Sequence, residues 1–456
     1  MARHRGGYFY FTVSIVNLLA FSAGVAQTWT SPVLPKLKTL DENPLGKVIT
    51  TSEASLVNAL LSIGNTFGPL LAVSASRYGR KITMLLIAIP ITIAYVALAF
   101  GSNIYVYYIA RFVKGLGVGS SLLILQIYLG EVAAKNNRGT FGCLSSVYYG
   151  LGALSVYAIG PYVSIKVFSL TCLTPVGLFL IFYAFIPESP IHLVLNGDNV
   201  GAEQSLIKLR GATDVKEELS EMVKFCEKKK TGNIRDILKS PALKKSLTIC
   251  FGLFIFRQLS GMDVILSNMQ IIFEAVGQSP ISAEQSPIII GACKIVVTIL
   301  TSLVVEKSGR KILLIFSATG ASLSILTLGI FFYLHEHNYD VSNVNLLPLI
   351  CMTLFIISCS FGLMPLPWAI LGEIFPNNVK STASSFAASL NYFVAFMVTL
   401  IFPYFEDFIG MSGGMIFFGV SSGVCVIFVW LVVPETKGKS LAEVQDMLDK
   451  KNDGSN

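Results

Sequence analysis

The sequence predicts an all-α membrane protein with twelve transmembrane helices, arranged as two six-helix repeats around a central cavity. Three observations lead to this prediction: an apolar composition, twelve long apolar runs, and motifs that recur between the two halves of the chain. Apolar residues make up 53% of the 456 residues and charged residues only 13%, about half the charged share of a typical soluble protein. So little charge could not cover a water-facing surface, and a chain this apolar is not disordered.

Each apolar run is close to the length that a membrane-spanning helix needs, about 20 residues. Backbone polar groups must be satisfied within lipid, so runs of this length are helices, whereas a β-barrel would show shorter alternating segments. We expect helices over residues 8–28, 54–74, 82–101, 104–127, 142–162, 167–186, 246–268, 286–305, 312–334, 346–371, 382–402 and 413–433. The first run has a basic start like a signal peptide, but eleven further runs favour its retention as the first helix.

Loop charges predict how the helices are oriented. The loops that share a side with the N-terminus contain most of the Lys and Arg residues between the runs, among them Arg77, Arg80 and Arg310. Loops rich in these residues lie in the cytosol. We therefore expect a multi-pass protein of the plasma membrane with both termini in the cytosol.

One long polar stretch, residues 187–245, separates six runs from the other six. Its mixture of Lys and Glu is typical of short amphipathic helices on a cytosolic face. We expect an N-terminal bundle over residues 1–186, a linker over residues 187–245, a C-terminal bundle over residues 246–433 and a cytosolic tail over residues 434–456.

Three motifs recur in the same order in the two halves, all on the predicted cytosolic side. The matched pairs are residues 77–81 (RYGRK) with 307–311 (KSGRK), Gly130-Glu131 with Gly372-Glu373, and residues 187–189 (PES) with 434–436 (PET). Two homologous six-helix bundles around a central cavity are the architecture of an alternating-access transporter.

The charged residues at these motifs are candidates for a gate. Acids of one half could pair with cations of the other half in one state and separate from them in another. Each such pair is weak, but a network of pairs can bias a two-state equilibrium; the alternative is that the cations only anchor the loops. The candidate gate residues are Arg77, Arg80, Glu131, Arg138, Glu306, Arg310, Glu373 and Lys380.

Together with GEVAAKNNRG, RQLSG, GLMPLPW, EIFP and the terminal PETKGKSLAEV, these motifs resemble the sugar porter family of the major facilitator superfamily over nearly the whole chain. The segment GVAQTWTSPVLPKL in the first run is similar to insect facilitated trehalose and hexose transporters. The resemblance implies one central substrate site and passive or proton-coupled movement of a sugar.

Sugar recognition needs amide or hydroxyl groups and an aromatic face, and the resemblance implies which residues supply them. Read from the residues alone, a Gln or Asn in a membrane helix is more often a contact between helices, and a Trp is often an interfacial anchor. The substrate-binding candidates are Gln258, Asp263, Asn268, Lys294, Trp368 and Asn391.

Three charged residues, Arg257, Asp263 and Lys294, stand where the family has neutral side chains, and Lys114 in the fourth run is a further unusual charge. Charges within a membrane are costly and indicate function. We expect Asp263 and Lys294 to pair. The pair is either a structural substitute for lost amides around a sugar site, or a sign of another substrate or of a proton-linked step through Asp263.

Proton coupling in the family usually uses an acid in the first span, and residues 8–28 contain no Asp or Glu. We therefore expect a facilitative transporter of a neutral sugar, a hexose or trehalose. The alternatives are a proton-linked carrier, a carrier of another polar organic solute, and a non-transporting membrane sensor. An enzyme is not expected, because no nucleophile–base pair, metal-ligand spacing or phosphate loop occurs among the spans. We expect no cofactor, no metal, no nucleic-acid partner and no obligate protein partner.

Overall fold

The structure is a computed structural model. It describes residues 7–40, 43–133, 138–212, 215–227, 241–276, 281–304, 309–375 and 379–437, together with Glu443 and Met447. These ranges contain helices and turns and no β-strand, which confirms the all-α prediction.

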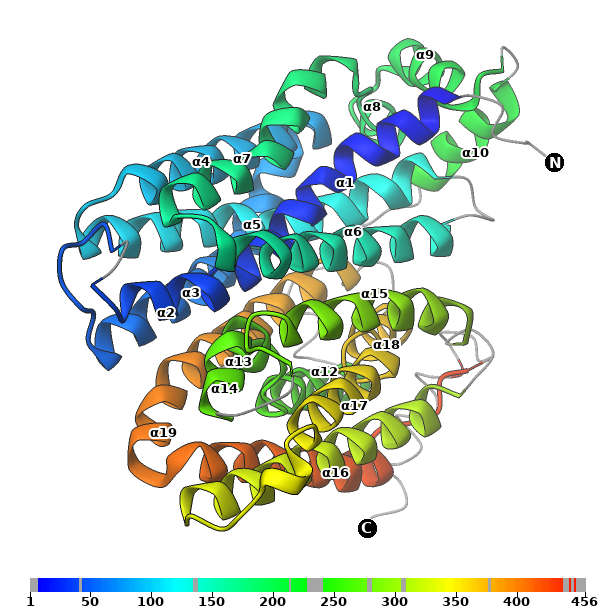
Figure 1. The fold of residues 1–456 in the computed structure, drawn as a ribbon. Helices are drawn as coiled ribbons and strands as arrows, with labels where there is room; N and C mark the ends of the chain where they lie inside the picture. Colours follow the sequence, from blue (N-terminus) through cyan, green and yellow to red (C-terminus); the bar gives the residue numbers. More distant parts are fainter. Residues whose placement is uncertain are drawn as a thin grey trace.

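The helices of the N-terminal half lie together in the upper body of Figure 1. They are α1 (Gly7–Thr28), α2 (Thr30–Leu37), α3 (Thr51–Ala75), α4 (Arg80–Phe100), α5 (Ile104–Val132), α6 (Arg138–Ile159) and α7 (Ile165–Phe182), with 3₁₀ turns η1 (Ser76–Tyr78), η3 (Gly160–Tyr162) and η4 (Tyr183–Phe185). Helix α1 packs against α5, α6 and α7, and α5 also packs against α3 and α4. Because α2 continues α1 with one intervening residue, the first span is longer than its apolar run predicts.

The helices of the C-terminal half form the lower body of Figure 1. They are α12 (Pro241–Leu259), α13 (Met262–Ser267), α14 (Met269–Ala275), α15 (Ser286–Val304), α16 (Arg310–Glu336), α17 (Leu347–Phe361), α18 (Leu366–Ile374) and α19 (Lys380–Val432), with the 3₁₀ turn η5 (Ser342–Val344). Helix α19 turns back on itself, as Figure 1 shows, at Gly410, whose φ of 77° interrupts the helix. A positive φ of this kind favours glycine.

Three short helices follow the N-terminal half along the chain: α8 (Pro190–Leu195), α9 (Asn199–Arg210) and α10 (Lys216–Glu227). They lie beside the start of α1 in Figure 1. Arg210 attaches them to α5, because its guanidinium donates to the carbonyl of Val132 at 2.8 Å and pairs with Glu218 at 2.7 Å. The boundaries predicted for the two bundles, the linker and the tail stay predictions.

Among the described residues, nine helices are long and apolar enough to cross a membrane, with α19 counted as one. Helix α6 and the shorter apolar helix α15 lie beside these nine. When they are included and α19 is divided at Gly410, the helices fit the predicted arrangement of twelve.

Helices α3 and α5 approach each other so closely that glycine is required where they cross. A Cβ atom on Gly64 would lie 2.3 Å from the carbonyl oxygen of Phe112, and one on Gly115 would lie 2.2 Å from the carbonyl oxygen of Leu61. Small residues allow helix backbones to approach within a membrane, where burial of apolar side chains does not drive helix association. These glycines therefore permit the close contact between α3 and α5.

We call the side of the bundle where α1 begins and α19 ends the terminal side, and the opposite side the distal side. Hydrogen bonds between the two halves gather toward the distal side. Thr30 donates to the carbonyl of Ser267 at 3.2 Å, and the Asn58 amide donates to Asn268 Oδ1 at 3.4 Å. Ser55 donates to the carbonyl of Leu400 at 2.7 Å. These contacts hold the two halves together on the distal side.

Candidate functional site

The centre of the candidate site is a break in the seventh span. Helix α12 ends at Leu259, and α13 begins after Gly261, whose φ of 78° is left-handed. One turn before the break, Gln258 Nε2 and Arg257 Nη1 both donate to the side-chain oxygen of Asn391 on α19, each at 2.8 Å. The structure thus brings together two of the predicted substrate-binding residues, Gln258 and Asn391, and adds Arg257 to them.

The predicted pair between Asp263 and Lys294 is wrong in this structure. Asp263 pairs instead with Arg257, at 3.8 Å between Oδ2 and Nη1. Lys294 is buried, its Nζ has no hydrogen-bond partner, and it lies 5.3 Å from the ring centroid of Tyr149 on α6. The reason is the break at Gly261, which redirects the chain between Arg257 and Asp263.

The remaining two candidates lie apart from this cluster of amides and charges. Trp368 on α18 is 36% exposed, and its ring packs edge-on against Phe254, one helical turn before Gln258, with 4.6 Å between ring centroids. Asn268 lies between α13 and α14 and contacts Asn58 of the other half, so it belongs to the distal contacts between the halves. Their roles in substrate binding stay predictions.

Two further cations are buried in the N-terminal half. Arg111 is fully buried, and its guanidinium donates to the carbonyls of Ala26 and Val57, both at 2.9 Å. Lys114 is fully buried as well; its Nζ has no hydrogen-bond partner and lies 4.9 Å and 4.4 Å from the ring centroids of Trp29 and Tyr95. Aromatic faces stabilise cations electrostatically, so this ammonium has aromatic neighbours in place of a carboxylate.

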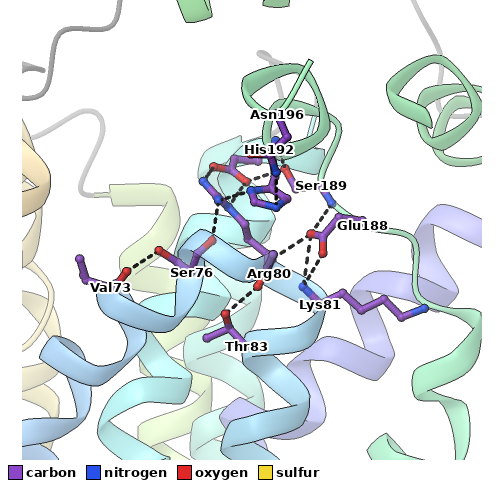
Figure 2. Close-up of polar contacts among 11 residues, drawn as sticks. Val73, Ser76, Arg80, Lys81, Thr83, Glu188, Ser189, His192 and Asn196 are labelled. Carbon is purple, nitrogen blue, oxygen red and sulfur yellow. Dashed lines mark hydrogen bonds and ion pairs between the residues drawn. The ribbon is translucent and has the colours of Figure 1, made fainter. Parts of the chain in front are cut away.

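On the terminal side, a cluster of charges joins α4, α5 and α8. Arg80 makes a two-pronged ion pair with Glu131, with contacts of 2.9 Å and 2.8 Å, and Ser189 donates to the same carboxylate at 2.5 Å. Figure 2 shows Arg80 beside Ser189, Glu188 and His192. The residues of this cluster come from the N-terminal half and from α8, which follows it along the chain.

The recurring motifs have a structural explanation in the first turns of α4 and α16. Glu188 accepts the backbone N–H groups of Arg80 and Lys81, as Figure 2 shows, and Glu435 accepts those of Arg310 and Lys311. Unpaired N–H groups at a helix start favour a carboxylate there. The preceding glycine leaves room for it, since a Cβ on Gly79 would lie 2.5 Å from Glu188 Oε2.

The C-terminal half carries a corresponding cluster. Arg310 pairs with Glu373 at 3.0 Å, and Thr436 donates to Glu373 at 2.5 Å. Acids and cations of the predicted gate therefore pair within each half here, whereas the sequence predicted pairs across the halves. Pairing across the halves in another conformation stays a prediction.

The other gate candidates have no described part in these clusters. Arg77 is exposed and contacts its neighbour Tyr78. Glu306 lies outside the described residues, and for Arg138 and Lys380 the structure describes the helix but not the side chain.

Several residues at these sites were not predicted. Sequence reasoning missed the contacts of Thr30 and Asn58 between the halves, the contact of Tyr149 with Lys294, and the hydrogen bond from Tyr157 to the carbonyl of Leu266. For a single hydroxyl or amide group within an apolar run, the sequence does not indicate which way the side chain points. Glu188 and Glu435 had a signal, since both stand in the recurring motif.

His192 occupies a position that makes the terminal cluster sensitive to pH. Its Nδ1 lies 2.8 Å from Arg80 Nη1, and a guanidinium can only donate, so Nδ1 accepts and the ring is neutral. Its Nε2 lies 2.9 Å from the Asn196 side-chain amide. Burial, and secondly the charge of Arg80, lower the pKa of His192 from 6.5.

We expect the chain to lose stability as the pH falls below the unfolded-state pKa of 6.5, and the variant His192→Gln to lose less. Because the folded-state pKa is lowered, the stabilising contribution is present above the unfolded-state pKa and is lost as the pH falls through the folded-state value. The measurement is denaturant unfolding in detergent at several pH values, with His337→Gln, an exposed histidine, as the control. Equal pH dependence of the wild type and His192→Gln would contradict the assignment.

Among the described residues, no group of three or more His, Cys, Asp or Glu side chains is placed to hold a metal ion.

Residues 12–448 match the protein family described as "Sugar (and other) transporter". The chain is 34% identical over 437 residues to a facilitated trehalose transporter of Polypedilum vanderplanki, covering 94% of this chain and 86% of that protein. It is 32% identical to a facilitated trehalose transporter of Culex quinquefasciatus, covering 94% of this chain and 84% of that one. It spans only 46% of the corresponding Drosophila grimshawi protein, to which it is 33% identical.

Among solved structures, the fold is similar to the xylose transporter XylE from E. coli in an inward open conformation. The TM-score is 0.81 at 22% identity, covering 96% of this chain and 99% of that chain. A second structure, of XylE described as a proton:xylose symporter of the major facilitator superfamily, has a TM-score of 0.79 at 23% identity, covering 97% of this chain and 99% of that one.

Proposed function

Because the chain belongs to the family of sugar (and other) transporters, we propose that it is a facilitative carrier of a neutral sugar, a hexose or trehalose, that works by alternating access. The names of its insect relatives support the substrate class. We also propose that it acts in the plasma membrane with the terminal side in the cytosol, as the loop charges indicate.

The contacts between the two halves are the observation that best supports this mechanism. The halves exchange hydrogen bonds on the distal side, while the charge clusters of the terminal side pair within each half. An alternating-access carrier needs contacts that close one side at a time around a fixed site. The amides of Gln258 and Asn391 and the ring of Trp368, which is 36% exposed, suit a sugar at that site.

The surroundings of Arg111 support passive transport over proton-linked transport, because the structure describes no acid beside this buried cation. Its guanidinium donates to backbone carbonyls of Ala26 and Val57 and has no carboxylate partner among the described residues. A proton-linked carrier needs a group that gains and loses a proton on the path. Asp263 is the one acid described in the central cluster, and it is the residue on which the proton-linked alternative depends.

Counterflow into proteoliposomes with a panel of sugars, polyols and amino acids tests the proposal. We expect labelled hexose or trehalose to exchange, and we expect the exchange to persist when an uncoupler removes the proton gradient. If net uptake collapses with the uncoupler and is lost in Asp263→Asn, the carrier is proton-linked. If no sugar exchanges while another solute does, the substrate assignment is wrong.

A further inference from the structure

With Lys294 protonated, the central cluster holds one more positive charge than negative charge. Arg257 and Lys294 are both buried, at 8% and 6% exposed, and Asp263 is the one carboxylate among the described residues that interacts electrostatically with Lys294. Asp263 lies within ion-pair distance of Arg257 and not of Lys294. The ammonium of Lys294 is therefore the unpaired charge.

No described group accepts a hydrogen bond from the Lys294 ammonium or from the Nε–H group of Arg257. Lys294 Nζ and Arg257 Nε are both buried without a hydrogen-bond partner. The ring of Tyr149, 5.3 Å away, is the one cation–π contact of Lys294 among the described residues. A buried, uncompensated cation carries a large desolvation cost, and in membranes such charges mark substrate or ion paths. A ligand that brings a negative charge would remove this cost with charge-assisted hydrogen bonds.

The fully buried charged residues that the structure describes in the N-terminal half are also basic. Arg111 and Lys114 are fully buried, and neither has a carboxylate among the contacts that the structure describes. A fixed positive charge such as the guanidinium of Arg111 attracts solutes of the opposite sign in a low-dielectric interior. Arg111 therefore adds a second buried positive charge without a described carboxylate partner to the interior.

We propose that the central site accepts, besides a neutral sugar, a sugar derivative that carries one carboxylate, such as a uronate or an aldonate, with the carboxylate bound at Lys294. This proposal rests on the proposed function, since Gln258, Asn391 and Trp368 are taken to bind the polyhydroxy part of the solute. One excess positive charge matches a monoanion better than a dianion such as a phosphate ester. The position of Lys294 at the contact of α15 with α6 of the other half would let the bound carboxylate act on both halves.

The first test is uptake of labelled glucuronate into proteoliposomes containing the wild-type chain. A passive carrier of a monoanion moves one charge, so an inside-positive potential of about 60 mV should raise the steady-state accumulation of glucuronate about tenfold. The distribution of glucose should not respond to the potential. This measurement needs no variant and is independent of how any substitution folds.

The second test uses a matched pair of lysine variants. Lys294→Gln should lower the ratio of glucuronate exchange to glucose exchange by about tenfold or more, the usual worth of a charge-assisted hydrogen bond in a dry site. Lys114→Gln should leave this ratio unchanged, because Lys114 is equally buried and unpaired but lies between Trp29 and Tyr95 in the other half.

The outcomes separate this proposal from the proposed function. Exchange of glucose without glucuronate, or an unchanged ratio in Lys294→Gln, overturns the sugar-acid site and leaves the sugar carrier standing. Equal entry of glucuronate and lactate overturns the recognition of a sugar acid, because the site would then bind any carboxylate. Exchange of neither glucose, trehalose nor glucuronate by folded protein overturns both.

Discussion

Replacing Gly115 by alanine is expected to lower the unfolding free energy by about 3 kcal/mol, or to prevent recovery of folded protein, since overpacking of a tight contact costs about this much. The added Cβ would lie 2.2 Å from the carbonyl oxygen of Leu61 and 2.9 Å from the Cα of Gly64. Both obstacles are backbone atoms of α3, so no side chain can rotate away. The helices would have to separate along their whole contact.

Gly130→Ala, on the same helix α5, is the matched control. Among the residues that the structure describes, a Cβ there meets no atom within 4 Å, and alanine is favoured over glycine within a helix by up to about 1 kcal/mol. We expect this variant to be as stable as the wild type or slightly more stable. Denaturant titration and the monodisperse yield in detergent measure both variants. Equal stability of the two would show that α3 and α5 do not cross as closely as described.

Much of the fold could be predicted because the bilayer restricts what an apolar run of about 20 residues can form. The lengths of individual helices were less predictable. The runs predicted over residues 382–402 and 413–433 belong to α19, which continues through the segment between them and turns only at Gly410. Hydropathy detects apolar surface, but not where a helix extends beyond it.

The candidate site was harder to predict, because it depends on the direction of a few side chains. In an unbroken helix, Arg257 and Asp263 would point about 120° apart, since successive residues differ by 100°. The left-handed Gly261 between them changes this relation, and Arg257 takes the carboxylate predicted for Lys294. The family resemblance could place these residues near a substrate. It could not show which of the two cations, Arg257 or Lys294, pairs with Asp263.

Substitution of Glu131 by glutamine is expected to destabilise the chain by about 3 kcal/mol, the usual cost of removing one partner of a buried ion pair. Glu131 accepts two hydrogen bonds from Arg80 and one from Ser189, and the side chains of Arg80 and Glu131 are each 11% exposed. Glutamine keeps the shape but leaves a buried guanidinium without a counter-charge. Denaturant titration in mixed micelles measures the loss.

Glu373→Gln provides the comparison at the matching position of the C-terminal half. Its carboxylate pairs with Arg310 through one oxygen, Oε1, and the side chain of Glu373 is 32% exposed. Water therefore replaces more of the lost interaction, and we expect a loss of about 1 kcal/mol. The repeat alone would predict equal losses, whereas burial predicts unequal ones. Equal losses, or a larger loss in Glu373→Gln, would contradict this prediction. Either result would show that burial of the Arg80–Glu131 pair does not decide how much the pair stabilises the chain.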